Sequence, residues 1–229
     1  VDIHLLGSMS NTNCLARANL ESAGEAVADL ARRRPAVYRA LARKLKLRPD
    51  EPAAWRRTAR GLVIPYDRKR DLYAEDDMYF HRVPFDRKRG KPDGRRVIDG
   101  TLPYEAMAFY QITKQSDVVT LMNLLPKAFT ARQKRLAYAF YEPRTVHDSS
   151  LSYAPHAVMA ARLGLRREAY RYFRDCAYLD IADIQLNTLC GLHFANLGGT
   201  WQAVIQGFAG LSVADGRLHL TPNLPAAWK

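Results

Sequence analysis

Several features that define common protein classes are missing from this chain of 229 residues. No apolar run approaches the roughly 18–20 residues that a membrane-spanning helix needs. The stretch VDIHLLGSMSNTN lacks the basic-then-apolar order of a signal peptide. Neither the GxxxxGK phosphate-binding loop nor the GxGxxG dinucleotide motif occurs. The sequence therefore does not support a membrane protein, a secreted protein, or a P-loop or Rossmann enzyme.

Cysteine is also scarce. The cysteines are odd in number, far apart and free of any CxxC pair, which argues against a disulfide scaffold and a zinc finger: Cys14, Cys176 and Cys190. The central histidines match no metal-ligand motif: His147, His156 and His193. We therefore expect no metal and no cofactor, and a reducing, cytoplasmic setting.

Charge of one sign dominates an otherwise ordinary globular composition. Lys and Arg number 35 against 23 Asp and Glu, which gives a formal charge of +12 and a pI near 9.8. This balance favours an anionic partner, such as nucleic acid, an acidic membrane or a phosphate-bearing substrate. No RNA- or DNA-binding motif is present, so a nucleic-acid partner is not favoured.

Helical spacing recurs along most of the chain, separated by short loops without strands. This pattern predicts a mostly α protein with helices paired antiparallel. Residues 61–100 break it, because they are rich in charge, Pro, Gly and aromatics; they predict a long irregular connection with a turn at 91–94. We expect helices at 14–34, from Pro35, near Trp55, at 102–112, at 116–125 with Ser116 as cap, from Thr130, at 152–163, at 166–179 and at 192–206.

The last segment changes from helical to alternating spacing. Leu211, Val213, Leu218 and Leu220 alternate with polar residues around Asp215-Gly216, which is a strong hairpin signal. Because an isolated hairpin is marginally stable at best, we expect residues 208–229 to be the start of a truncated β domain.

Three polar stretches could carry chemistry. In 141–152, the hydroxyls of Ser149 and Ser150 could form an anion site at the start of a helix, or could merely cap that helix. In 187–201, the N–H of Gly191 and the imidazole of His193 could bind an oxyanion, although a histidine in such a position is more often a buried core residue.

The third stretch is 113–117. Lys114 and Gln115 stand at a predicted helix entrance, where they could bond sugar hydroxyls or an acidic ligand. The alternative is an exposed lysine beside an N-cap.

These stretches, in this order, resemble glycoside hydrolase family 65, the α-glucoside phosphorylases and some α-glucosidases. The matching text is TKQSDVV at 113–119, YEPRTVHDSSLS at 141–152 and GLHFANLGGTW at 191–201, with weaker matches in NTNCLAR at 11–17, IPYD at 64–67 and LPAAW at 224–228. The pieces span nearly the whole chain. Cys190 is a departure, because relatives often carry an acidic or a different small residue there.

The resemblance implies a fold as well as a function. It implies that residues 1–207 form the second half of an (α/α)6 toroid and that 208–229 open a C-terminal β-sandwich. The family's Gly-Pro-Asp-Glu stretch, whose Glu is the general acid, would fall at or before Val1. We therefore expect the chain to be a fragment that lacks material at both ends and is inactive alone.

The implied reaction transfers glucose from a disaccharide to inorganic phosphate, with inversion to β-glucose 1-phosphate and without a metal. By resemblance, Ser149, Ser150, Gly191 and His193 would bind phosphate, and Lys114 and Gln115 would bind the sugar. The intact enzyme would be a cytoplasmic homodimer. The alternatives are an α-glucoside hydrolase of the same family, trehalase-like, and an inactive basic helical module that binds anions or nucleic acid.

Overall fold

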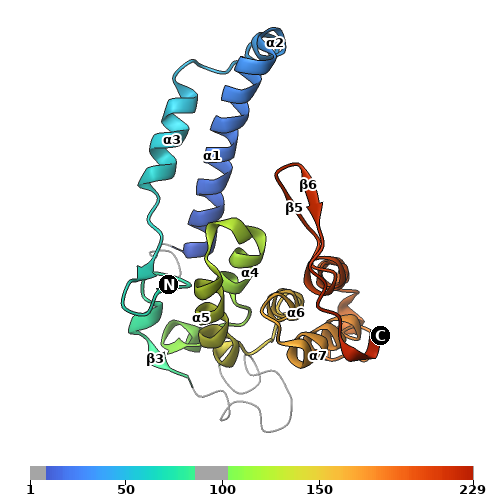
Figure 1. Cartoon of the computed structure of the whole chain (residues 1–229). Helices are drawn as coiled ribbons and strands as arrows, with labels where there is room; N and C mark the ends of the chain where they lie inside the picture. Colours follow the sequence, from blue (N-terminus) through green and yellow to red (C-terminus); the bar gives the residue numbers. More distant parts are fainter. Residues whose placement is uncertain (1–8, 86–102, 229) are drawn as a thin grey trace.

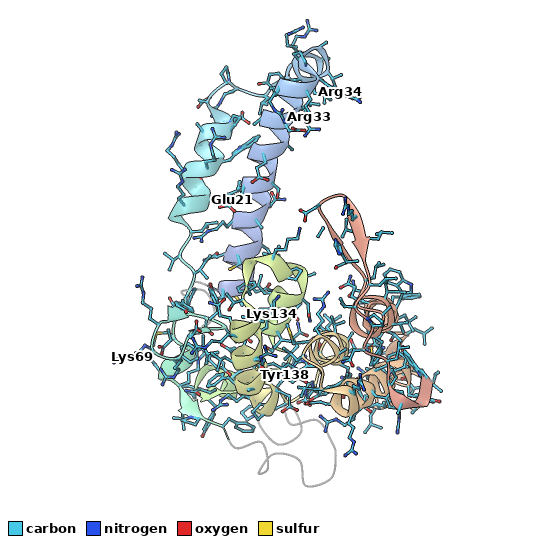
Figure 2. All side chains as sticks on the ribbon, in the orientation of Figure 1. Glu21, Arg33, Arg34, Lys69, Lys134 and Tyr138 are labelled. Atoms are coloured by element: carbon cyan, nitrogen blue, oxygen red, sulfur yellow. The ribbon has the colours of Figure 1, made fainter. Side chains whose placement is uncertain are left out.

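A computed structural model describes residues 9–85 and 103–228. The first described part begins with three helices: α1 (Ser10–Arg33), α2 (Pro35–Leu45) and α3 (Glu51–Gly61). α1 and α3 lie side by side as an arm, with α2 across its far end (Figure 1). Arg17 of α1 fixes the returning chain, because its guanidinium donates to the carbonyl oxygens of Ala59 (3.0 Å) and Leu62 (2.7 Å). Arg33 and Arg34 stand near the far end of the arm (Figure 2).

Short strands connect this arm to the body. β1 (Tyr66–Asp67) pairs antiparallel with β2 (Leu72–Tyr73), and a 3-10 turn, η2 (Tyr79–His81), follows. β3 (Val83–Pro84) pairs in parallel with β4 (Tyr110–Gln111). The irregular connection expected at 61–100 is confirmed over 62–85, and the turn expected at 91–94 lies outside the described residues.

The helix predicted at 102–112 is wrong. The described part of this segment holds a 3-10 helix, η4 (Tyr104–Ala108), followed by β4. The segment pairs with a distant partner: the N–H of Val83 donates to the carbonyl of Phe109 (3.0 Å), and the Gln111 amide donates to the carbonyl of Arg82 (3.0 Å). Tertiary pairing therefore outweighs the local helical spacing.

Four helices form the body: α4 (Asp117–Leu124), α5 (Ala131–Tyr141), α6 (Tyr153–Arg162) and α7 (Arg166–Ala177). The 3-10 turns η5 (Pro126–Ala128) and η6 (Glu142–Arg144) follow α4 and α5. The expected Ser116 cap is present, since its hydroxyl accepts the N–H of Val119, and Thr130 forms a capping box with Gln133 at the start of α5. α6 is buried along most of its length against α7 and the chain that follows α8.

The C-terminal part begins with η7 (Thr188–Cys190) and α8 (Phe194–Gln202), which continues as a π-helical turn, η8 (Ala203–Phe208). The glycine pair in α8 permits close packing: a Cβ on Gly199 would lie 2.6 Å from that of Ala154, whereas one on Gly198 would meet nothing within 4 Å. The hairpin prediction is confirmed by β5 (Ser212–Ala214) and β6 (Arg217–His219), which project from the body (Figure 1), and a last turn, η9 (Ala226–Trp228), follows.

The structure is mostly helical, as expected. The described helices include none that is long and apolar enough to cross a membrane. The division at residue 207 stays a prediction, as does the toroid.

Candidate functional site

The first stretch, Lys114-Gln115-Ser116, forms the turn that enters α4. Beneath it lies the carboxyl group of Glu75, which accepts the Ser116 hydroxyl (2.8 Å) and the N–H groups of Asp117 (3.2 Å) and Val118 (3.4 Å). Lys114 and Gln115 are half-buried beside this anchor. Glu75 therefore holds the turn in place from a position about forty residues earlier in the chain.

Glu75 is an unusual acid. Its side chain is buried, and burial raises its pKa from 4.5 to about 8, helped by the nearby negative charge of Asp117. The three donors lower the pKa, and burial outweighs them. Burial also raises the pKa of Asp117.

The second stretch meets the first directly. The Ser149 hydroxyl donates to the side-chain oxygen of Gln115 and also accepts the N–H of Leu151 (3.2 Å). Behind this contact, the two segments exchange backbone bonds: the N–H of Val146 donates to the carbonyl of Thr113 (2.9 Å). The structure therefore brings together one predicted sugar-binding residue and one predicted phosphate-binding residue. Ser150 is half-buried next to them.

The third stretch is held by two aspartates that precede it. Both oxygens of Asp180 face His193: one lies 2.5 Å from Nδ1, and the other accepts the His193 N–H at 2.9 Å. Asp183 accepts the N–H groups of Asn187 (2.9 Å) and Thr188 (3.0 Å) and so closes the turn before η7. These hydrogen bonds hold the pKa of both aspartates below the ordinary value.

His193 is partly exposed, with 19% of its side-chain surface accessible, and not a core residue. The prediction for the backbone of Gly191 requires a correction. Its N–H, expected to be available to an anion, donates to the carbonyl of Thr188 at 2.9 Å within the turn. Gly191 has φ +123°, which explains the glycine, because L side chains rarely adopt that backbone conformation.

The second and third stretches are linked through Gln185. Its buried side-chain amide donates to the carbonyl of His147 at 3.4 Å. Within the described part of the chain, Ser149 and His193 form no hydrogen bond with each other. That Ser149, Ser150 and His193 bind the same phosphate stays a prediction.

Sequence reasoning missed the residues that support the site: Glu75, Asp180, Asp183, Gln185 and the buried His147. The only local signal for Asp180 and Asp183 is their spacing: the two aspartates stand three residues apart, and a polar turn follows them. The support from Glu75 and Gln185 depends on long-range contacts that no local spacing reveals.

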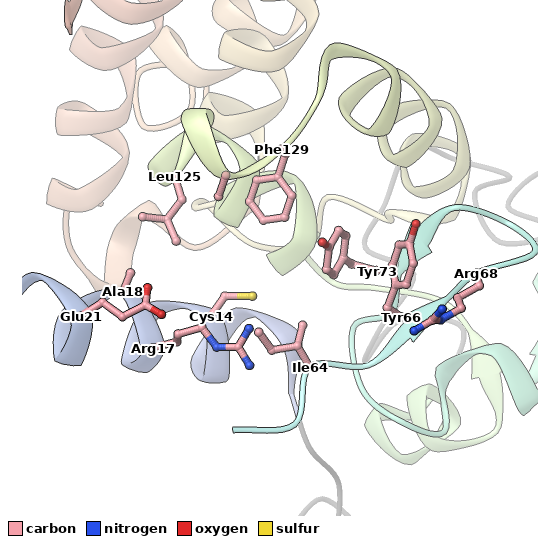
Figure 3. Close-up of a pocket in the computed structure, with 11 residues that line it drawn as sticks. Cys14, Arg17, Ala18, Glu21, Ile64, Tyr66, Arg68, Tyr73, Leu125 and Phe129 are labelled. Carbon is pink, nitrogen blue, oxygen red and sulfur yellow. The ribbon is translucent and has the colours of Figure 1, made fainter. Parts of the chain in front are cut away.

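A separate hollow of about 520 Å³ lies between α1, the β1–β2 segment and the turn after α4 (Figure 3). Cys14, Tyr73 and Phe129 are among its lining residues, and none of the sequence candidates is. Gln115 precedes α4 and Phe129 follows it, so the eight residues of α4, about 12 Å along the axis, separate the hollow from the candidate site. The described residues hold no group of three or more His, Cys, Asp or Glu that could bind a metal.

Comparisons with known proteins agree with the resemblance. The chain is 35% identical over 219 residues to a kojibiose phosphorylase of Caldanaerobacter subterraneus subsp. tengcongensis, covering 95% of this chain and 28% of that protein. It is 35% identical over 226 residues to an α,α-trehalose phosphorylase of Thermoanaerobacter brockii, covering 98% and 29%. The chain therefore spans less than a third of the length of these curated relatives.

A solved structure supports the same assignment. The structure of a putative kojibiose phosphorylase from the human microbiome matches with a TM-score of 0.80 and 29% identity, covering 93% of this chain and 29% of that one. The model of the glycosyl hydrolase family 65 central catalytic domain matches residues 8–202. With most of its length inside that match, the chain belongs to glycosyl hydrolase family 65.

Proposed function

We propose that this chain forms part of the (α/α)6 catalytic toroid of an inverting α-glucoside phosphorylase. The enzyme transfers glucose from a disaccharide to inorganic phosphate and releases β-glucose 1-phosphate. Membership of the family and similarity to proteins named kojibiose and trehalose phosphorylases support this activity. The contact between Ser149 and Gln115 is the observation that carries the assignment to this site, because it joins the proposed phosphate and sugar subsites.

Inverting cleavage requires an acid at the leaving oxygen and a nucleophile on the opposite face of the sugar. In a phosphorylase that nucleophile is phosphate, so the protein must supply donors for an anion. The Ser150 hydroxyl is such a donor, and the Ser149 hydroxyl becomes one when phosphate takes the place of Gln115 as the acceptor of its proton. Lys114 and Gln115 bond the glucose hydroxyls. We assign the general acid to no described residue.

His193 has a defined role in this scheme. Nδ1 of His193 is hydrogen-bonded to Asp180, so Nε2 is the ring nitrogen that can bind a ligand. Nε2 donates to a phosphate oxygen when the ring carries both protons, and Asp180 neutralises the resulting charge. Gly191 contributes an exposed backbone without a side chain, which leaves space for the anion.

A hydrolase of the same family would need a carboxylate that activates water in place of phosphate. Two carboxyl groups near the site are already engaged in hydrogen bonds: Glu75 accepts three donors, and both oxygens of Asp180 face His193. These hydrogen bonds keep Glu75 and Asp180 from acting as that base. Cytoplasmic location, a homodimer and phosphate as the only co-substrate remain part of the proposal.

The test uses the protein expressed from its complete gene, incubated with kojibiose or trehalose, with and without inorganic phosphate. We expect glucose 1-phosphate to form only when phosphate is present. Ser149→Ala should weaken phosphate use by about ten- to a hundredfold, the equivalent of one hydrogen bond to a charged group. Ser22→Ala, on the exposed surface of α1, is the matched control and should change nothing.

Two results would contradict the proposal. Release of free glucose at the same rate without phosphate would identify a hydrolase. Absence of turnover by a folded protein, together with binding of nucleic acid, would identify the basic helical module.

A further inference from the structure

A chain of buried hydrogen bonds runs behind the Ser149–Ser150 turn. Glu142 accepts the hydroxyl of Tyr172 at 2.6 Å, and the same hydroxyl lies 3.0 Å from Nε2 of His147. On the other side of the ring, Nδ1 of His147 lies 2.8 Å from the Ser152 hydroxyl. His147, Ser152 and Tyr172 are each no more than 3% exposed. A continuous path therefore joins η6, α7 and the loop that carries Ser149.

The backbone at His147 is constrained as well. Its φ is +57°, a left-handed conformation that is strained for a residue with a Cβ. Tyr153 stacks on the imidazole with 5.6 Å between ring centroids and 10° between planes. Such a conformation persists where the surroundings over-determine it. In the turn that follows, the N–H of Ser152 donates to the carbonyl of Ser149 (3.0 Å).

Counting the hydroxyl and ring protons shows which atom donates in each of these hydrogen bonds. A carboxylate only accepts, so the single hydroxyl proton of Tyr172 goes to Glu142. The Tyr172 oxygen must then accept from His147, which places the ring proton on Nε2. In the neutral ring, Nδ1 then carries a lone pair, which accepts the hydroxyl proton of Ser152.

We propose that Glu142 and Tyr172 are positioning residues that act through His147. They hold the neutral imidazole with its proton on Nε2 and fix the left-handed turn, and that turn orients Ser149 and Ser150. The part these serines play with phosphate rests on the proposed function. The positioning itself is a property of the described chain and can be measured without turnover.

The experiment compares Tyr172→Phe with Tyr170→Phe. Both variants remove one phenolic hydroxyl from α7, and Tyr170 packs instead against Phe173 and Trp228. Nitrogen-15 NMR of the histidine rings reports which nitrogen carries the proton, and amide hydrogen exchange reports the rigidity of residues 147–152. In the parent protein and in Tyr170→Phe we expect the proton on Nε2. In Tyr172→Phe we expect it to move toward Nδ1, with faster exchange at 147–152.

Glu142→Ala provides a second variant, because it leaves the packing of Tyr172 in place. Without the carboxylate, the Tyr172 hydroxyl is expected to donate to Nε2 and so to shift the ring proton to Nδ1. An unchanged tautomer and unchanged exchange in a folded Tyr172→Phe or Glu142→Ala protein would overturn the proposal.

Binding of inorganic phosphate separates this proposal from the proposed function. We expect Tyr172→Phe to weaken phosphate binding by about two- to tenfold, the equivalent of one ordinary hydrogen bond. If the parent protein binds no phosphate while the tautomer and the exchange respond as expected, the positioning role stands and the phosphate site fails. If the parent binds phosphate and Tyr172→Phe alters neither the tautomer nor the exchange, the positioning role fails alone.

Discussion

Replacing Glu75 by Gln should remove a loss of stability that this protein undergoes as the pH rises. Glu75 is buried under the Lys114–Ser116 turn, and its pKa in the folded chain is raised to about 8. In the unfolded chain the ordinary value of 4.5 applies. Glutamine has nearly the same shape and no titration, so the variant removes the charge and retains the side-chain volume.

The sign follows from proton binding. Between pH 4.5 and about 8 the folded protein keeps a proton on Glu75 that the unfolded chain has lost. The free energy of unfolding therefore falls as the pH rises through this window, by up to about 1.4 kcal/mol per pH unit. Over the whole window the loss approaches about 5 kcal/mol. Below pH 4.5 the group contributes no pH dependence.

The glutamine side chain also lowers the free energy of unfolding, because it loses a hydrogen bond. Its oxygen can accept the Ser116 hydroxyl, but its NH₂ group faces the N–H of Asp117, so one hydrogen bond is lost at about 0.5–1.5 kcal/mol. Glu75→Gln should therefore be slightly less stable than the parent at pH 4 and several kcal/mol more stable at pH 8.5. The two stability curves should cross.

Urea unfolding at a series of pH values, followed by circular dichroism, measures this crossing. Glu21→Gln, an exposed site on α1 (Figure 2), is the control and should leave the curve parallel to that of the parent. Parallel curves for Glu75→Gln would refute the reasoning. They would mean that the start of α4 and its three donors stabilise the ionised carboxylate enough to cancel the burial.

Two further predictions concern single side chains. His193→Ala should weaken the response of turnover to phosphate by about ten- to a hundredfold. His219→Ala, in the exposed hairpin, is the control. A lower melting temperature with an unchanged dependence of rate on phosphate would contradict the role of His193. Gly199→Ala should destabilise the fold by about 1–3 kcal/mol in thermal unfolding, because the new Cβ would lie 2.6 Å from Ala154. Gly198→Ala, with open space around it, should instead stabilise α8 by up to about 1 kcal/mol, and equal effects at the two sites would contradict the packing argument.

The sequence predicts the elements whose signals are local. Ser116 and Thr130 accept backbone N–H groups at the helix starts where they were expected, and Pro35 occupies the first turn of α2. Asp215 and Gly216 both have positive φ in the turn between β5 and β6, as the Asp-Gly signal predicts. In each case a few adjacent residues determine the geometry.

The predictions that failed concern geometry that local spacing does not determine. The segment at 102–112 has helical spacing, yet its end forms β4 because Val83 and Arg82 offer backbone partners nearly thirty residues away. The N–H of Gly191 is consumed inside a short turn that spacing alone does not show. The anchoring of Ser116 by Glu75 requires the fold itself, since nothing near Glu75 in sequence points to it.

The acids at the candidate site share a feature that bears on its chemistry. Glu75 accepts from Ser116 and α4, Asp180 accepts from His193, and Glu142 accepts from Tyr172. Each uses its carboxyl oxygens to hold a donor-bearing segment. A site that binds phosphate must limit the repulsion from its own carboxylates, and hydrogen bonds to those oxygens do so. A site that activates water needs the reverse, a carboxylate with an open lone pair toward the substrate. These three acids therefore serve as structural acceptors, and an anion as the nucleophile stays part of the proposed function.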